Sequence, residues 1–455
     1  MKNNKNNSLK LLIGGLLILV FLILANMVET MVKERQERKY EAIEEVGSKW
    51  GEDQILAGPV LTVPYKKNMG QNEKGEHIFQ TDYINFLPNN LDIKGDVNSK
   101  ILKRGIFEIV TYNSKLFFSG DFKNLNFEKY NIKKENVLAD QAVISVFIPD
   151  MRGINETVKL KWNNRDFDFN PGIGDKEGNV IFNPKNRLYK FSGISTRVPL
   201  TLQDTDQSDD FYFELDLNGS KELSFLPFGK QTNVAVNSDW PYPSFDGAFL
   251  PDEREVNDSG FSANWKILQL NRGYPQSWKG ALEDVDLVFN SIFKIKLLVG
   301  VDHYQKTMRS VKYAILFISL TFLFFFFMET INKIRIHPLQ YVLVGLALVL
   351  FFTLLLSISE YISFGWAYLA STVATIGLIG FYSKSVLGKI KFSLMISLVL
   401  TLLYVFIYII LQMQETSLLI GSIGLFIILA AIMFFTRKVN WYSDSNSEKP
   451  KKSDK

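Results

Sequence analysis

The run LLIGGLLILVFLILANMV, residues 11–28, is almost entirely apolar and long enough to form a helix across a bilayer. A secretory signal peptide would have a shorter apolar core and a cleavage site of small residues, and the context NMVETMVKERQ offers none. We therefore predict an uncleaved transmembrane anchor. It is followed by a polar region of about 280 residues and then, after about residue 310, by a second apolar region.

The second apolar region contains five runs, at residues 313–328, 341–358, 364–382, 392–411 and 418–435, which we interpret as spans two to six. Their central parts lack Asp, Glu, Lys, Arg and His, so an ion-coupled transporter is disfavoured. A carrier of a neutral or lipidic solute stays open as an alternative. Glu329 and Glu360 lie at run ends, where we expect water to reach them. Pro338 fits the start of span three.

The cationic residues predict an orientation. Lys and Arg occur in residues 1–10, in 329–340, in 384–391 and in the tail 436–455, whereas the segments ISEYIS and QMQETS contain neither. Cationic loops stay on the cytoplasmic side. We therefore predict that both termini are cytoplasmic and that the large polar region lies outside. Three cations near the outer end of span two depart from this pattern: Lys306, Arg309 and Lys312.

Composition excludes several kinds of chemistry. The chain has no Cys, which rules out disulfides, thiolate nucleophiles and Cys-ligated metal sites. Its three histidines, His77, His303 and His337, have no metal-ligand or triad spacing, and LPFGKQT lacks the first glycine of a phosphate loop. A net charge of +4 is too small to indicate nucleic acid. We predict no cofactor and no metal, with the lipid bilayer as one partner.

The polar region begins as a helix and continues as strands. In residues 29–50, Tyr40, Ile43, Val46 and Trp50 recur at helical spacing. From residue 51 to about 310 the pattern has period two, as in ILAGPVLTVPY and FYFELDLNGSKELSFLPFG. Asn218-Gly219 is a strong hairpin signal. We predict a large, mainly antiparallel β domain, either as one module or as two that meet near residues 160–200.

The stretch SDWPYPSFDGAFLPDEREVNDSGFSANW, residues 238–265, is dense in aromatic and acidic residues. Paired carboxylates beside aromatic rings could form a glycosidase-like site, which makes an envelope-modifying hydrolase one alternative. The same residues fit Pro-rich turns with solvated acids and aromatic rings in the core, and we favour this interpretation. The acids concerned are Asp246, Asp252, Glu253, Glu255 and Asp258, which cluster with Arg254.

Several blocks of the chain resemble the CreD family of bacterial inner-membrane proteins, often called cell envelope integrity proteins. The blocks are WGEDQILAGPVLTVPY, RGIFEIVTYNSKLFFSGDF, ISVFIPDMRGI, SDWPYPSFDGAFLPDEREV, SGFSANW, KYAILFISLTFLFFFFMETI, IHPLQYVLVGLALVLFFTLLLSISEYISFGWAY and FFTRKVNWY, which occur in this order over about residues 8–442. The resemblance implies an N-terminal anchor, a large periplasmic domain and a C-terminal five-helix bundle, six transmembrane helices in total.

The resemblance also implies a role in envelope integrity and no established enzymatic activity, so there are no catalytic residues to transfer. We expect a non-enzymatic protein whose outer domain contacts an envelope protein or polymer. The resemblance singles out signature positions without a known role, namely Asp150, Arg152, Gly153, Trp240, Pro241, Pro243, Phe245, Arg254, Glu255, Gly260, Phe261, Trp265, Glu329, His337, Pro338 and Glu360.

Overall fold

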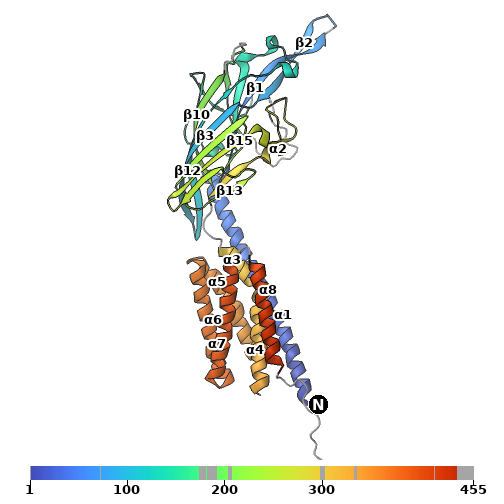
Figure 1. Ribbon diagram of the computed structural model, residues 1–455, viewed down its shortest axis with the longest axis vertical. Coiled ribbons are helices and arrows are strands. Elements are labelled where there is room, and N and C mark those ends of the chain that lie inside the picture. The colour runs from blue at the N-terminus through green and yellow to red at the C-terminus, as the bar shows by residue number, and fades with distance from the viewer. Residues whose placement is uncertain are drawn as a thin grey trace, which may run out of the picture. The chain divides into compact units, whose positions relative to one another are not determined.

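The computed structural model describes residues 2–71, 73–173, 181, 192–202, 208–297, 303–332, 336–413 and 416–437. The chain divides into two compact units (Figure 1). A helical unit comprises residues 1–39 and 301–455, and a β unit comprises residues 40–300. This division follows the change in composition along the sequence, because apolar runs and period-two runs bury their side chains in different ways.

Helix α1 (Lys2–Trp50) belongs to both units, since its residues up to Lys39 belong to the helical unit and the remainder to the β unit. The helix is continuous over 49 residues and covers both the apolar run 11–28 and the segment 29–50. It ends before Gly51, whose φ of 153° is unfavourable for other residues.

The β unit contains two large sheets. The nine-stranded sheet consists of β13 (Pro243–Gly247), β17 (Phe293–Leu297), β11 (Glu222–Phe225), β1 (Gln54–Gln71), β5 (Ala142–Phe147), β9 (Gly193–Val198) and β8 (Asn170–Pro171), with β2 (His77–Phe86) pairing with β1 and β16 (Ser277–Lys279) pairing with β2. The eight-stranded sheet has the order β14 (Glu253–Asn257), β15 (Gly260–Leu268), β12 (Gln231–Ser238), β3 (Asn90–Arg104), β4 (Phe107–Phe122), β10 (Asp209–Ser220), β6 (Lys159–Trp162) and β7 (Arg165–Asp168). A short helix, α2 (Val285–Phe289), precedes β17.

Strand pairing in the described residues is antiparallel except for two parallel pairs, β1 with β11 and β12 with β3. The sheets are therefore mixed, and the prediction of a mainly antiparallel β region is confirmed. The hairpin predicted at Asn218-Gly219 is wrong. Both residues lie inside β10, paired with Asn113 and Tyr112 of β4. Gly219 is needed there because a Cβ would lie 2.3 Å from the Tyr112 hydroxyl oxygen.

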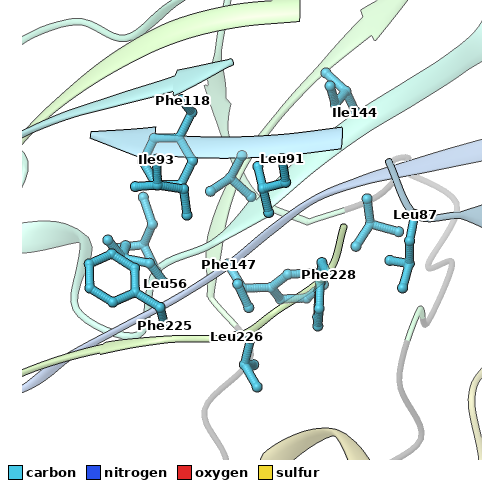
Figure 2. Packing of buried hydrophobic residues seen from close by; sticks show 14 of the residues in the cluster. Leu56, Leu87, Leu91, Ile93, Phe118, Ile144, Phe147, Phe225, Leu226 and Phe228 are labelled. Carbon is cyan, nitrogen blue, oxygen red and sulfur yellow. The ribbon is translucent and has the colours of Figure 1, made fainter. Parts of the chain in front are cut away.

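Alternate residues of each strand fill the core between the sheets. In β10, Phe211, Phe213, Leu215 and Leu217 are buried, and the residues between them point outward. Figure 2 shows Ile93 and Phe118 packed with residues of the other sheet. Burying each such side chain stabilises the fold by about 1.5–3 kcal/mol.

The helical unit contains, besides α1, the helices α3 (His303–Lys312), α4 (Ala314–Asn332), α5 (Pro338–Ser359), α6 (Phe364–Leu387), α7 (Ile390–Gln412) and α8 (Ser417–Thr436). Each of the six apolar runs falls on one of these helices. Among the described residues, α1, α5, α6 and α7 are long and apolar enough to span a membrane. Helices α3 and α4, bent by 41°, make a fifth candidate, and the apolar part of α8, Leu419–Phe434, is shorter.

Candidate functional site

Three signature residues surround the end of helix α1. Arg152 donates from Nε to Asp150 Oδ1 at 2.7 Å and from Nη2 to Glu52 Oε1 at 2.8 Å. Its Nη1 donates to the backbone carbonyl of Ser48 in the last turn of α1 at 2.7 Å. A cation at this position also interacts favourably with the negative end of the helix dipole. We call this group of residues, Ser48, Glu52, Gln54, Asp150 and Arg152, the Arg152 clamp.

The carboxylate of Asp150 is the buried centre of the clamp, with 6% of the residue exposed. Burial alone would raise the pKa of Asp150, but hydrogen bonds from Arg152 and from the Glu52 and Arg152 backbone N–H groups outweigh it, and the pKa is lowered. Gln54 completes the group by donating from Nε2 to the carbonyls of Asp150 and Asn218, both at 3.1 Å.

Gly153 is required for close packing in the clamp. A Cβ at this position would lie 2.3 Å from the carbonyl oxygen of Asn218 and 3.0 Å from Nε2 of Gln54. Neither neighbour is free to move, because one is strand backbone and the other is held by two hydrogen bonds. The three signature residues of this segment therefore have a structural explanation.

Two further contacts hold the end of α1 in the β unit. Arg104, at the end of β3, donates to both carboxylate oxygens of Glu45 at 2.8 and 3.1 Å. Trp50 Nε1 donates to the carbonyl of Tyr112 at 3.3 Å. Together with the clamp, these contacts fix the last two turns of the helix against strands β3, β4 and β10.

Five of the six aromatic residues of the stretch 238–265 lie in the core or pack against it, whereas Tyr242 is 62% exposed. Trp240 is 7% exposed and Trp265 is 2% exposed. The indole of Trp265 donates to the carbonyl of Phe249 at 3.3 Å and packs against Phe245 and Phe293. The favoured interpretation, that these rings are core rather than a sugar platform, agrees with the structure for five rings and is wrong for Tyr242.

The remaining signature residues of this stretch shape the turns and the strands around these rings. Pro241 lies between β12 and β13, Pro243 begins β13, and the ring of Phe261 lies 5.6 Å from that of Phe245. Gly260 has a φ of 140°, and a Cβ there would lie 2.0 Å from the Ser238 carbonyl oxygen.

The acidic residues of the stretch are divided between the two sheets. Asp246, on β13, forms an ion pair with Lys296 of β17, which lowers the pKa of its carboxyl. A general acid needs the opposite shift, so Asp246 is poorly suited to that role. Glu253 and Glu255 lie on β14 of the other sheet. The guanidinium of Arg254 lies 6.0 Å from the Phe245 ring centre, in a cation–π contact.

A polar pocket lies on the outer face of the eight-stranded sheet, beside Trp265 but on the opposite side from its ring. Its volume is about 440 Å³. Strands β3, β12 and β15 and the start of β14 line it. Its polar lining comprises Asp92, Lys94, Asn233, Asp252, Glu253, Asn264 and Lys266. The sequence stretch thus supplies both core rings and part of a surface pocket, because strand residues alternate between the two faces.

The comparisons with known proteins agree on one family. The sequence pattern of the family described as "Inner membrane protein CreD" matches residues 6–442. A curated protein of that name from Escherichia coli (strain K12) is 30% identical over 437 residues, which cover 95% of this chain and 93% of the relative. The chain belongs to the CreD family. It is accordingly an inner membrane protein, as the resemblance of its sequence blocks implied.

The CreD signature residues of the helical unit lie at helix ends. His337 is the N-cap of α5, where its Nδ1 accepts a hydrogen bond from the Leu339 N–H at 3.3 Å. Gln340 Oε1 accepts from the His337 N–H at 2.9 Å, and Pro338 is the first helical residue. These contacts satisfy N–H groups that have no partner within the helix.

Water was expected to reach both acids of the CreD helical unit, but Glu329 is only 6% exposed. Its two oxygens accept from the Ile336 N–H at 3.3 Å and the Tyr341 hydroxyl at 3.2 Å. This expectation was wrong for Glu329 because Ile336 and Tyr341 cover its carboxylate. Glu360 accepts from the Tyr304 hydroxyl at 3.3 Å and lies 3.7 Å from Nε of Arg35.

The sequence blocks identified the CreD signature positions, but they did not predict which distant residues these positions contact. Arg152 and Glu52 are 100 residues apart, and no periodic pattern links them. The pocket combines the 238–265 stretch with β3 and β12, which single-sequence patterns cannot align. No cluster of three potential metal ligands occurs in the described residues. The absence of cofactors and of enzymatic activity stays a prediction.

Proposed function

We propose that this CreD protein is a six-span inner-membrane protein with cytoplasmic termini and a periplasmic β domain, residues 51–310, that supports envelope integrity by contacting an envelope component. The observation that carries the proposal is the Arg152 clamp. The clamp joins the last turn of the anchoring helix to the β domain through side-chain hydrogen bonds.

The distribution of cations supports this orientation, and two of the three exceptions, Lys306 and Arg309, have local hydrogen-bond partners. Arg309 donates from Nη2 to the carbonyls of Ile410 and Met413 at the end of α7, at 3.2 and 3.0 Å. Lys306 donates to Gln412 Oε1 at 3.0 Å. Cations at a helix C-terminus compensate its dipole and its unpaired carbonyls. Arg309 and Lys306 thus have local partners, and their presence is consistent with an outer location.

The absence of cysteine makes the orientation directly testable. Ser259→Cys places a thiol in the exposed turn between β14 and β15, and Ser385→Cys places one near the end of α6. In intact spheroplasts, a membrane-impermeant maleimide should label only the first variant, and both should react after permeabilisation. The cysteine-free parent is the control. Labelling of Ser385→Cys alone in intact spheroplasts would reverse the proposed topology.

A rescue experiment separates the non-enzymatic role from the hydrolase alternative. In a deletion strain with an envelope defect, we expect rescue by each of the single variants Asp246→Asn, Asp252→Asn, Glu253→Gln, Glu255→Gln and Asp258→Asn. The pairing of Asp246 with Lys296 supports this expectation, because it holds the carboxylate in its charged form. Loss of rescue by one variant that is still folded and abundant would favour the hydrolase.

The carrier alternative is better supported for a lipidic solute than for a polar one. A groove of about 710 Å³ between α4, α7 and α8 is lined by apolar residues such as Phe324, Leu402 and Ile427. Leu402→Trp would fill it, whereas Leu394→Trp lies on α7 outside the lining. If the groove holds a lipid chain, native mass spectrometry should show loss of bound lipid in the first variant only.

A further inference from the structure

The outer face of the eight-stranded sheet carries three rows of side chains in register. The register aligns five neighbouring strands, β15, β12, β3, β4 and β10, so each row is about 20 Å long at ~4.8 Å per strand. Two rows also reach β14. The first row is Lys266, Asn233, Asp92, Ser119 and Tyr212; the second is Glu253, Asn264, Ala235, Lys94, Phe117 and Glu214; the third is Glu255, Ser262, Asn237, Asp96, Lys115 and Asp216.

Most carboxylates on this face already accept a hydrogen bond or form an ion pair within the protein. Asn233 donates to Asp92 at 2.7 Å, and Lys115 forms an ion pair with Glu214 at 2.7 Å. Asp216 accepts from Asn113 at 2.6 Å. The face is therefore a network of amide and carboxylate groups with fixed directions. Such a network offers hydrogen-bond donors and acceptors side by side.

The pocket on this face lies above its smallest residue, Ala235. Ala235 sits in the second row between Asn264 and Lys94, and the pocket of about 440 Å³ opens above it. Farther along the first row, Ser119 is small and leaves room beside Tyr212, which is 42% exposed. The polar pocket and the exposed ring of Tyr212 thus lie on the same face of the sheet.

We propose that this face binds a neutral glycan chain. One sugar ring would occupy the pocket above Ala235, and the ring of Tyr212 would stack on another. Adjacent hydroxyl and acetamido groups need a donor and an acceptor close together, which the Asn–Asp pairs and the ammonium groups of Lys94 and Lys266 supply. This deepens the proposed function, because it rests on the outer domain contacting an envelope component and names its chemical class.

Charge and polarity disfavour other ligands. The three rows contain three lysines (Lys94, Lys115 and Lys266) against six acids (Asp92, Asp96, Asp216, Glu214, Glu253 and Glu255). An anionic polymer would be repelled by this excess of acids. An apolar protein partner would leave the network of amides and carboxylates without water and incompletely paired, which is costly. A neutral polyhydroxylated chain meets neither penalty.

The test uses the full chain in nanodiscs and a soluble N-acetylglucosamine oligosaccharide as the probe, with binding measured by calorimetry. Ala235→Trp fills the pocket, and Tyr212→Ala removes the stacking ring. Both residues point away from the core, so folding should persist and can be checked by tryptophan fluorescence. We expect each variant to lower affinity at least tenfold. Lys103→Ala, on the same sheet outside the rows, is the matched control and should bind normally.

Two results would overturn the inference: no binding by the unmodified chain, or equal affinity of Ala235→Trp and the control. An extended peptide that binds along the edge strand β14, unaffected by Tyr212→Ala, would assign the face to a protein partner instead. Failure of the glycan inference can be distinguished from failure of the proposed function. If the glycan does not bind but the chain still rescues the deletion strain with the proposed orientation, only the ligand class is wrong.

Discussion

Arg152 illustrates how one exposed side chain can control a buried group. Its side chain is 58% exposed, yet its guanidinium donates to Asp150, whose side chain is 7% exposed. Sequence resemblance marked both residues but could not give their roles, because the partners Ser48 and Glu52 lie about 100 residues earlier. For single residues, the sequence therefore identified the signature positions but did not predict their contacts.

We predict that Arg152→Ala lowers the free energy of unfolding of the β unit by about 1–2 kcal/mol at neutral pH, since it removes charge-assisted hydrogen bonds to a buried carboxylate. The pKa of Asp150 is lowered in the folded state. Its contribution is therefore present above the unfolded pKa and is lost as pH falls through the folded pKa. The difference between variant and parent should shrink over that acidic range.

Chemical denaturation followed by tryptophan fluorescence measures this effect. Lys133→Ala is the matched control, because its ion pair with Glu135 is 77% and 72% exposed and should contribute little. A difference between Arg152→Ala and the parent that did not change with pH would show that the contact with Asp150 is not what stabilises the clamp.

At the scale of elements, the apolar runs predicted helices well and the period-two runs predicted strands. The Asn218-Gly219 error shows the limit of such signals. A dipeptide that favours a turn was placed inside a strand because Gly219 makes room for Tyr112. Local patterns report what a segment can form, and packing against distant residues decides which form it takes.

Helix α1 packs onto the bundle through a similar small residue. Phe21 is 2% exposed, and a Cβ on Gly345 of α5 would lie 2.2 Å from its ring. We predict that Gly345→Val destabilises the helical unit by about 1–3 kcal/mol through overpacking. Gly377→Val is the control, because a Cβ there meets no atom within 4 Å.

A second-site change tests this mechanism by thermal unfolding in detergent. In a Phe21→Ala background, Gly345→Val should cost much less stability than in the parent, because the ring with which the new side chain collides is absent. Strictly additive losses in the double variant would mean that the two residues do not interact.

For the whole molecule, composition predicted two regions, and the structure has two units with separate hydrophobic cores. The order of strands could not be predicted, since β1 pairs in parallel with β11 through residues as distant as Gln54 and Leu223. Two β regions with the same local patterns can be connected in many ways. Single-sequence periodicity contains no information about which connection forms.

We predict two unfolding transitions for the full chain, one for each core. Arg152→Ala should shift only the β-unit transition, and Gly345→Val only that of the helical unit. Tryptophan fluorescence reports mainly on the β unit, because five of the seven tryptophans belong to it: Trp50, Trp162, Trp240, Trp265 and Trp278. A single cooperative transition shifted by both variants would show that α1 couples the units into one thermodynamic body.

The pairing of β1 has a consequence for biosynthesis. Strand β1 leaves the ribosome early, but its neighbour β11 pairs in turn with β17, which ends at Leu297. At ~5–20 residues per second, synthesis of the intervening chain takes about 10–50 s. Until β17 emerges, the sheet that contains β1 and β11 is incomplete at the free edge of β11. The nascent domain is therefore exposed to misassembly, and the cell must keep it from aggregating until its last strand emerges.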